Sequence, residues 1–362
     1  MLFRASGMPR TLRCGASVRF PQARPDVDTD PAREGTCAAW VAECVMNGDA
    51  SSAEDYLGET HENGWVVDDD MVRHCQWYID TIMARAGHHR AEVYVKHPTL
   101  PMAGTADHIG WSDDMQTLYV DDLKYGYKVV EATSPQLTAY LFLVLSNIPP
   151  EQWPKLVQLS ILQPRALHKD GPYRKRVVSV AEMQPDLDHM QAMIEYVINT
   201  PDPVATPGAH CYRCAKALGC TALTQSVYAT WEAIQSREYL DPTPEQLSTE
   251  LTMLERMTDL FEARNTAVRA EADAKLAEGG FIPGWAVQKK FGNKKFTVDD
   301  VSIQMITGID PTVKKTCTPA ELIRRGARKE VVDTITTNPF IGTTIKRVDE
   351  SDVAAHFAQA KH

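Results

Sequence analysis

Two aspartates and a lysine between Gly104 and Val130 have the types and spacing needed for metal-dependent chemistry. Asp107 lies in one strand-like run, and Asp122 and Lys124 lie in the next, with the turn-forming sequence SDDMQ between them. Side chains alternate faces along a strand, so Asp122 and Lys124 share a face, and an antiparallel return would bring Asp107 close to both. Buried carboxylates are costly unless they are paired or bind a metal. Because carboxylate oxygens suit Mg²⁺ or Mn²⁺, the segment predicts a divalent-metal site beside a lysine.

The helix expected after this strand pair carries Gln136 and Tyr140 one turn apart, and therefore on one face. A single D-x-K triplet is more often an ordinary salt bridge at the solvated end of a hairpin, and that alternative stays open for the triplet alone. The ordered set G-x-x-D, D-x-K and Q-x-x-x-Y argues for a functional site instead.

These three motifs, in this order, resemble the PD-(D/E)XK nucleases of the RecB type. The resemblance implies that Asp107 and Asp122 bind Mg²⁺ or Mn²⁺ together with the backbone carbonyl of Leu123. It also implies that Lys124 is the catalytic lysine, and that Gln136 and Tyr140 line the DNA side of the site. The expected activity is that of a DNA exonuclease, in which metal-activated water attacks the phosphodiester in line. The expected fold is a mixed α/β, restriction-endonuclease-like core with a mixed central sheet flanked by helices.

The chain departs from the RecB-type pattern on an early helix. Members of that family usually carry a histidine metal ligand in a context like E-G-T-x-x-H, whereas REGTCAA places Ala39 at that position. Alanine cannot bind a metal, so the resemblance implies a weakened or inactive nuclease. The alternative is a DNA-binding or scaffold protein that keeps the nuclease fold without cleaving. Glu43, one turn further on, is either a partial substitute or a helix-surface acid, and the surface acid is the more common case.

A second candidate metal site is the C-x2-C-x5-C pattern of Cys211, Cys214 and Cys220. A tetrahedral site needs a fourth ligand. His210 is poorly placed because it adjoins Cys211, whereas Cys14 is distant in sequence but free. The spacing does not match ferredoxin runs, and the residues alone allow zinc.

Iron–sulfur members of the RecB-type nucleases pair one N-terminal cysteine with a C-terminal C-x2-C-x5-C pattern. They include AddB-type recombination nucleases and CRISPR-adaptation nucleases. The resemblance therefore implies a 4Fe–4S cluster that joins the two ends of the nuclease domain, with zinc or no metal as the alternatives. The remaining cysteines are expected to be ordinary thiols: Cys37, Cys44, Cys75 and Cys317.

The composition is that of an ordinary globular protein, with 362 residues, of which 43% are hydrophobic and 24% charged. The net charge of −10 gives no global attraction to DNA, so a DNA partner must meet a local basic surface. The candidates, each of which could equally be a solvated loop, are residues 167–176 and the lysines Lys289, Lys290, Lys294 and Lys295. We expect a cytoplasmic protein with no membrane partner, since the N-terminus lacks an apolar signal segment and LTAYLFLVL is too short to span a bilayer. That the cytoplasm is that of a bacterial host is implied only by the resemblance to phage-encoded proteins given below.

Hydrophobic periodicity predicts helices at 34–48, 68–87, 134–147 and 181–200, and strands at 91–98, 102–112, 117–126, 155–165 and 173–180. A nuclease domain is expected over residues 1–230, followed by a C-terminal helical and α+β extension over 231–362. The extension should begin with a long helix capped by TPEQ at 243–246, and then form a hairpin around Phe291-Gly292-Asn293. The layout also resembles an uncharacterised family of phage-encoded proteins found among replication and recombination genes. That likeness implies DNA processing, with a phage single-strand-binding or annealing protein as a further partner.

Overall fold

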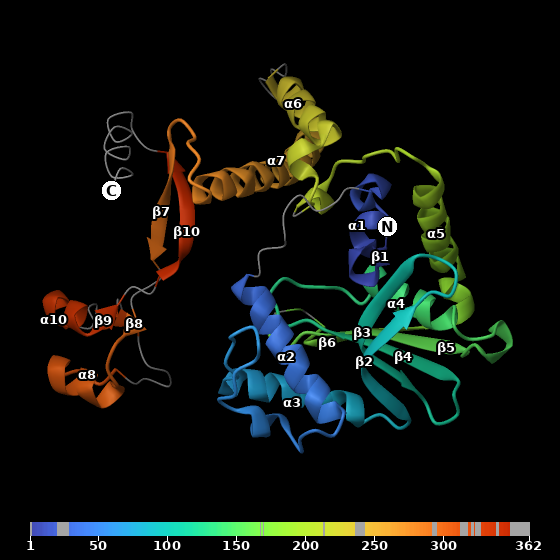
Figure 1. Cartoon of the computed structure of the whole chain (residues 1–362), viewed down its shortest axis with the longest axis horizontal. Helices are drawn as coiled ribbons and strands as arrows, with labels where there is room; N and C mark the ends of the chain where they lie inside the picture. The colour runs from blue at the N-terminus through green and yellow to red at the C-terminus, as the bar shows by residue number, and fades with distance from the viewer. Residues whose placement is uncertain are drawn as a thin grey trace. The chain divides into compact units, whose positions relative to one another are not determined.

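The structure is a computed structural model of the chain (Figure 1). It describes residues 2–19, 29–166, 168, 170–212, 214–235, 243–291, 295–311, 318–319, 322, 327–337 and 340–347. Two compact units are present, Met1–Arg264 and Asn265–His362. The division between them falls inside α7 (Pro244–Ala277), which is a continuous helix. The domain boundary expected near residue 230 therefore stays a prediction.

A mixed six-stranded sheet forms the centre of the first unit. Its strands are β1 (Phe3–Arg4), β2 (His88–Lys96), β3 (Met102–Trp111), β4 (Thr117–Leu123), β5 (Leu156–Leu162) and β6 (Tyr173–Ser179). The order is β1-β3-β4-β5-β6, and β2 pairs along β3. β4 and β5 run parallel, as do β1 and β3, whereas β2–β3, β3–β4 and β5–β6 are antiparallel.

Helices cover the sheet on two sides (Figure 1). One hydrophobic cluster joins α2 (Asp30–Met46) and α3 (Asp69–Met83) to Leu123 and Leu162 of the sheet. A larger cluster joins α4 (Pro135–Leu145) and α5 (Val180–Asn199) to the other strands. The mixed sheet flanked by helices, expected from the sequence, is thereby confirmed.

The helix α4 explains the apolar run that the sequence analysis singled out. Every residue from Leu137 to Leu145 is buried, so the helix is apolar on all sides because it lies inside the core. Full burial of each leucine stabilises the fold by about 2 kcal/mol. Ser134 caps the helix by accepting a hydrogen bond from Gln136 N, with Pro135 at the first helical position. Among the described residues, no helix is long and apolar enough to cross a membrane.

The first unit also contains α1 (Met8–Thr11), α6 (Thr221–Gln235) and the short 3₁₀ helices η1 (Ala5–Gly7), η2 (Gly15–Val18), η3 (Ala53–Tyr56), η4 (Pro150–Gln152), η5 (Ala209–Cys211) and η6 (Ala217–Gly219). The helix α7 begins as TPEQ predicts. Thr243 N donates to Gln246 Oε1 at 2.9 Å, and Gln246 N donates to Thr243 Oγ1 at 3.3 Å.

The hairpin expected in the second unit is wrong. β7 (Trp285–Phe291) pairs antiparallel with β10 (Phe340–Arg347), while β8 (Lys295–Phe296) pairs with β9 (Thr336–Thr337). Both partners are at least forty residues further along the chain, so the local turn signal gave no hint of them. The unit also contains α8 (Asp300–Thr307) and α10 (Lys329–Thr334). The expected turn residues Gly292 and Asn293, together with Lys294 and Cys317, lie outside the described residues.

Candidate active site

The strands β3 and β4 bring the two aspartates of the sequence motif together. The two strands pair antiparallel, from Trp111 with Leu118 to His108 with Asp121. Asp107 is the residue of β3 immediately before His108. Asp107 Oδ2 accepts a hydrogen bond from Leu123 N at 2.7 Å. The backbone of Leu123 and the carboxylate of Asp107 are therefore neighbours, as the motif requires.

Asp122 and Lys124 form the expected pair on one face. Lys124 Nζ lies 2.6 Å from Asp122 Oδ2, and the Asp122 side chain is fully buried. Gln136 connects the two, because its Nε2 donates to Asp122 Oδ1 at 2.9 Å and its Oε1 accepts from Lys124 Nζ at 3.3 Å. Gln136 Nε2 also lies 3.1 Å from the Tyr140 hydroxyl. The first turn of α4 thus holds the side chains at the end of β4 in a fixed arrangement.

The electrostatics of this cluster are those of crowded acids. Burial raises the pKa of Asp107 well above its ordinary value, and the nearby charge of Asp122 raises it further. Burial also raises the pKa of Asp122, although Lys124 opposes that shift. Burial alone would lower the pKa of Lys124, but the two carboxylates outweigh it and raise the pKa, so Lys124 is charged at neutral pH. Shifts of this kind are common at catalytic sites.

A small pocket beside Asp107 shows where Ala39, the position of the expected histidine, lies relative to the proposed metal ligands. α2 contributes Ala39, Ala42, Glu43 and Met46, α3 contributes Tyr78, and the sheet contributes Ala91, Glu92, Asp107 and Leu123. Its volume is about 190 Å³, including space open to solvent. Ala39, the position where the RecB-type pattern has histidine, therefore faces the same space as Asp107. Glu43 lines that space too, so it is more than a helix-surface acid.

Asp121 points into a separate buried network. Arg85 donates to it through two nitrogens, at 2.6 and 3.1 Å, and His108 Nδ1 donates at 2.8 Å. His108 Nε2 is 3.1 Å from His89 Nδ1, and His89 Nε2 donates to Arg85 O at 2.9 Å. Every member of this network has a protein partner, and we therefore assign the network a structural role in stabilising the fold.

Replacing this buried acid should be costly at neutral pH. Burial alone would raise the pKa of Asp121, but the hydrogen bonds from His108 and Arg85 lower it below the ordinary 3.8. The folded-state pKa is thus below the unfolded-state value, so the network contributes stability above about pH 4 and loses it as pH falls further. Asp121→Asn should lower the free energy of unfolding by about 3 kcal/mol at pH 7, measured by urea denaturation.

The difference between Asp121→Asn and the parent should shrink once the pH falls below about 4. Asp113→Asn, a change at an exposed acid in the β3–β4 turn, is the matched control and should unfold like the parent. Equal stability of Asp121→Asn and the parent at pH 7 would contradict the assignment.

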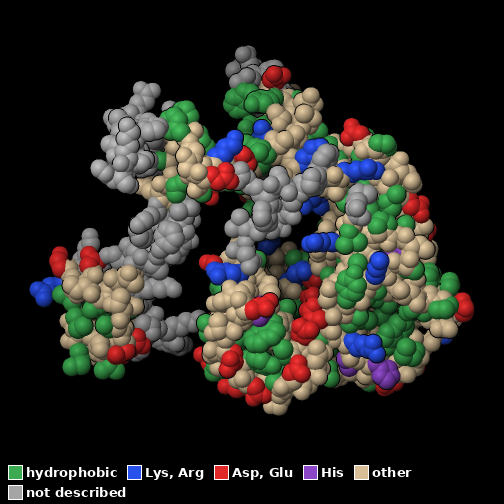
Figure 2. All heavy atoms as spheres, viewed as in Figure 1, with side chains coloured by type: hydrophobic (Ala, Val, Ile, Leu, Met, Phe, Trp, Pro, Cys, Tyr) green, Lys and Arg blue, Asp and Glu red, His purple; other side chains and the backbone are tan. Residues whose placement is uncertain are grey.

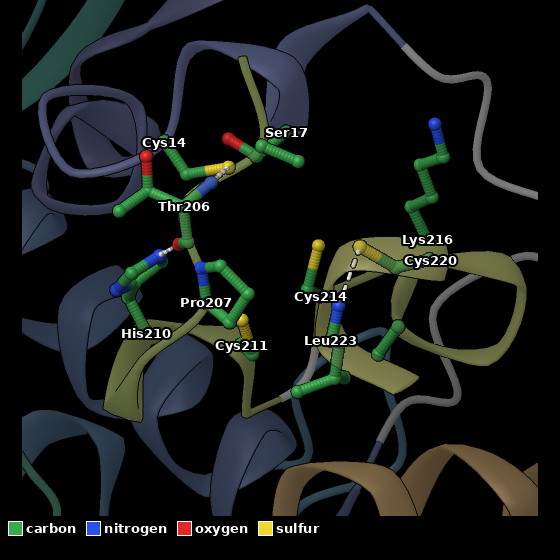
Figure 3. A pocket seen from close by; sticks show the side chains of 12 residues that line it. Cys14, Ser17, Thr206, Pro207, His210, Cys211, Cys214, Lys216, Cys220 and Leu223 are labelled. Carbon is green, nitrogen blue, oxygen red and sulfur yellow. Dashed lines mark hydrogen bonds between the residues drawn. The ribbon is translucent and has the colours of Figure 1, made fainter. Parts of the chain in front are cut away.

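The four cysteines proposed as a cluster site line one pocket, although Cys14 and Cys220 come from opposite ends of the expected nuclease domain. The pocket has a volume of about 350 Å³, including space open to solvent. Figure 3 shows the sulfur atoms of Cys14, Cys211, Cys214 and Cys220 turned toward this common space. All four are free thiols, and Cys14 and Cys211 are buried. Burial raises the pKa of Cys211, and the other three thiols raise it further, which places all four in one electrostatic neighbourhood.

Backbone groups support this arrangement. Thr206 N donates to Cys14 Sγ at 3.5 Å, and Leu223 N donates to Cys220 Sγ at 3.4 Å. Arg10 Nε donates to His210 O at 3.2 Å, which fastens the N-terminal segment to the cysteine loop. The His210 ring donates to Thr206 O at 2.7 Å and is occupied there (Figure 3).

The remaining described cysteines behave as ordinary thiols. Cys37 and Cys75 are fully buried in the cluster between α2 and α3, and burial raises the pKa of Cys37 to about 11. Cys44 is half-buried. In the residues that the structure describes, no group of three or more His, Cys, Asp or Glu side chains is placed to hold a single metal ion.

The expected basic surface is only partly supported. In the stretch 167–176, Arg174 is buried and donates to Val130 O and to Gln163 Oε1, so it serves the fold. Leu167 and Lys169 lie outside the described residues. Lys289 and Lys290 lie in β7 and Lys295 lies in β8, and their role stays a prediction.

A comparison with known families gives one match that extends over almost the whole chain. The family described as "Protein of unknown function (DUF2800)" matches residues 2–351. The chain belongs to the DUF2800 family.

Two solved structures are also similar to this DUF2800 chain. The crystal structure of SSO0001 is 14% identical and covers 59% of this chain and 85% of its own, with a TM-score of 0.28. The structure of an alkaline exonuclease, LHK-Exo from Laribacter hongkongensis, is 10% identical and covers 54% of this chain and 89% of its own, with a TM-score of 0.21. Both TM-scores are too low to carry an argument, so the site is interpreted from its own geometry.

Two residues that line the pocket beside Asp107 were not predicted from the sequence, Glu92 and Tyr78. Glu92 lies in β2, and burial raises its pKa to about 7, with added contributions from the charges of Glu43 and Asp122. Tyr78 lies in α3, where the sequence predicted only a helix over 68–87. Neither residue belongs to a motif. An acid inside the strand-like run AEVYVK is the one signal that would have pointed to Glu92.

Proposed function

We propose that the first unit is a divalent-metal-dependent nuclease that cleaves DNA. The observation that carries the proposal is the meeting of Asp107, Asp122 and Lys124 at the end of β4, with Gln136 bonded to two of them. The order of these residues in the chain implied this arrangement, and the geometry is consistent with it. An exonuclease of phage replication and recombination, in the cytoplasm of a bacterial host, is the finer form of the proposal and rests on the resemblance.

The donor set fits Mg²⁺ or Mn²⁺. Two carboxylates beside the backbone of Leu123 provide hard oxygen ligands. Burial raises the pKa of both, so each carboxylate is costly to ionise there and a bound cation would stabilise its charge. A divalent ion bound there would activate water and neutralise charge on the phosphate.

Each remaining side chain has a role that its contacts suggest. Lys124 is partly exposed, so its ammonium can reach a phosphate and stabilise the charge that develops there. Gln136 orients Asp122 and Lys124 at once, because its amide group contacts both. Tyr140 fixes the amide of Gln136 from the next turn of α4.

A local basic surface supports DNA as the partner. Figure 2 shows several Lys and Arg side chains on the face of the first unit near α2, with Asp and Glu side chains beside them. The net charge of the chain is −10, so these local charges would have to attract the phosphate backbone.

We also propose that Cys14, Cys211, Cys214 and Cys220 hold a structural 4Fe–4S cluster. In such a cluster each thiolate binds a different iron, which suits four sulfur atoms spaced around a pocket larger than one ion. Zinc is the second candidate. A visible absorption spectrum distinguishes the two, since a zinc protein is colourless and an iron–sulfur protein is brown.

A non-cleaving DNA-binding or scaffold protein is the second candidate function, and Ala39 is the observation that favours it. The deciding experiment incubates the purified chain with linear single- and double-stranded DNA in Mn²⁺, Mg²⁺ or a chelator. Cleavage that requires the metal supports the nuclease. Binding of DNA without cleavage in either metal supports the second candidate.

A further inference from the structure

Glu92 lies directly across from Asp107 in the sheet. The paired residues of β2 and β3 include Ala91 with His108 and Val93 with Ala106, and Glu92 falls between them. The carboxylates of Glu92 and Asp107 are close enough for each to contribute to the charge around the site. Strand pairing, and not the sequence motif, therefore puts a third acid beside the proposed metal ligands.

The backbone of Glu92 is held in an unusual conformation. Its φ angle is +47°, in the left-handed region that glycine adopts freely and glutamate rarely does. Such a conformation costs about 1–2 kcal/mol. It persists only where the surrounding structure fixes it, and such positions gather at functional sites. Here it interrupts the regular pairing with Asp107.

The pocket between Glu92 and α2 has acids but no basic side chain among its lining residues. Glu43, Glu92 and Asp107 line it, and the remaining lining side chains are alanines, Met46, Leu123 and Tyr78. Within the described chain, neither Glu43 nor Glu92 has a hydrogen-bonding or salt-bridge partner for its carboxylate. Lys124 is paired with Asp122 and is not part of this lining.

An independent observation points to a ligand in the same pocket. The Tyr78 side chain is 1% exposed, and its hydroxyl has no hydrogen-bond partner among the described residues. A buried hydroxyl without a partner costs about 1–3 kcal/mol. Burial raises the pKa of Tyr78, and the charges of Asp107 and Glu92 are among those that raise it further, so the hydroxyl lies near these carboxylates.

We propose that Glu92 takes the place of the missing histidine, so that the carboxylates of Glu92 and Asp107 together bind a divalent cation in the space left open by Ala39. This inference rests on the proposed nuclease function and extends it to the ligand set. Mg²⁺ and Mn²⁺ keep several waters and need only one or two carboxylates from the protein. Glu92 and Asp107 supply two carboxylates from this pocket, and the charge of Asp122 also acts on Glu92. The unpartnered Tyr78 hydroxyl lies near the same acids.

The test measures Mn²⁺ binding to the full chain by calorimetry, without DNA. Glu92→Gln should weaken binding by roughly tenfold or more, as Asp107→Asn should, because each removes one anionic ligand. Glu54→Gln removes one negative charge at an exposed position of η3 and should bind like the parent. Glu92→Gly serves as a second variant, since glycine accepts the positive φ, and it should show the same loss while melting no lower than the parent without metal.

A rescue experiment separates a ligand from a merely structural acid. In the Glu92→Gln background, Ala39→His should restore Mn²⁺ affinity to within roughly threefold of the parent, because an imidazole would enter the same pocket. If Glu92→Gln and Glu92→Gly bind Mn²⁺ like the parent while Asp107→Asn does not, Glu92 is not a ligand, and the proposed nuclease function stands. If the parent itself binds no Mn²⁺, both proposals are wrong.

Discussion

Replacing Lys124 with alanine is expected to lower metal-dependent DNA cleavage by about a thousandfold. Its ammonium is the one basic group in the cluster formed with Asp107, Asp122 and Gln136, and the two carboxylates keep it charged at neutral pH. Removing a single well-placed group that stabilises charge in a transition state typically costs a factor of about 10²–10³. The measurement is the initial rate of nucleotide release from linear DNA in Mn²⁺.

The same variant should bind Mn²⁺ at least as tightly as the parent. The ammonium repels a cation and occupies an oxygen of Asp122, so its removal leaves the carboxylates more available. A rate loss without an affinity loss therefore separates Lys124 from the metal ligands. Lys155→Ala, at an exposed lysine just before β5, is the matched control and should cleave like the parent. Unchanged cleavage by Lys124→Ala would mean that the activity arises elsewhere or from a contaminating nuclease.

The central part of the site could be predicted because it depends on local rules. Alternation along β4 placed Asp122 and Lys124 on one face, and the structure pairs them at 2.6 Å. Helical spacing placed Gln136 and Tyr140 together, and they are 3.1 Å apart. The turn after β3 predicted the antiparallel return that brings Asp107 to Leu123. These relations span at most a few dozen residues and leave a direct trace in the sequence.

The part that could not be predicted depends on pairing between distant segments. Glu92 reaches Asp107 through the register of β2 on β3 and a positive φ angle, and neither has a sequence signature in a glutamate. The strand β7 pairs with β10, and no turn signal near residue 291 could predict that pairing. The spacing of Cys211, Cys214 and Cys220 suggested a site, but Cys14 was joined to them only by resemblance before the structure brought it to the same pocket.

Cys14→Ser is expected to leave the purified protein with less than about a tenth of the parent's iron. The residue supplies one sulfur atom of the four-cysteine pocket from the N-terminal segment, and a hydroxyl is a poor ligand for iron in a cluster. A bound cluster would join that segment to the loop before α6, so its loss should also lower the melting temperature and solubility. Iron content, the visible absorption band and thermal unfolding measure the three effects. Cys214→Ser should behave in the same way.

Cys75→Ala provides the matched control for this prediction. Cys75 is more completely buried than the pocket cysteines, and it lies in the apolar cluster between α2 and α3. Its replacement should leave the iron content and the visible band unchanged, whatever small change in packing it causes. Full iron retention in Cys14→Ser would exclude that residue from the site. If the parent protein is colourless and contains zinc, the four cysteines bind a single zinc ion and not an iron–sulfur cluster, because four thiolates also form a closed zinc site. In that case Cys14→Ser should lose zinc.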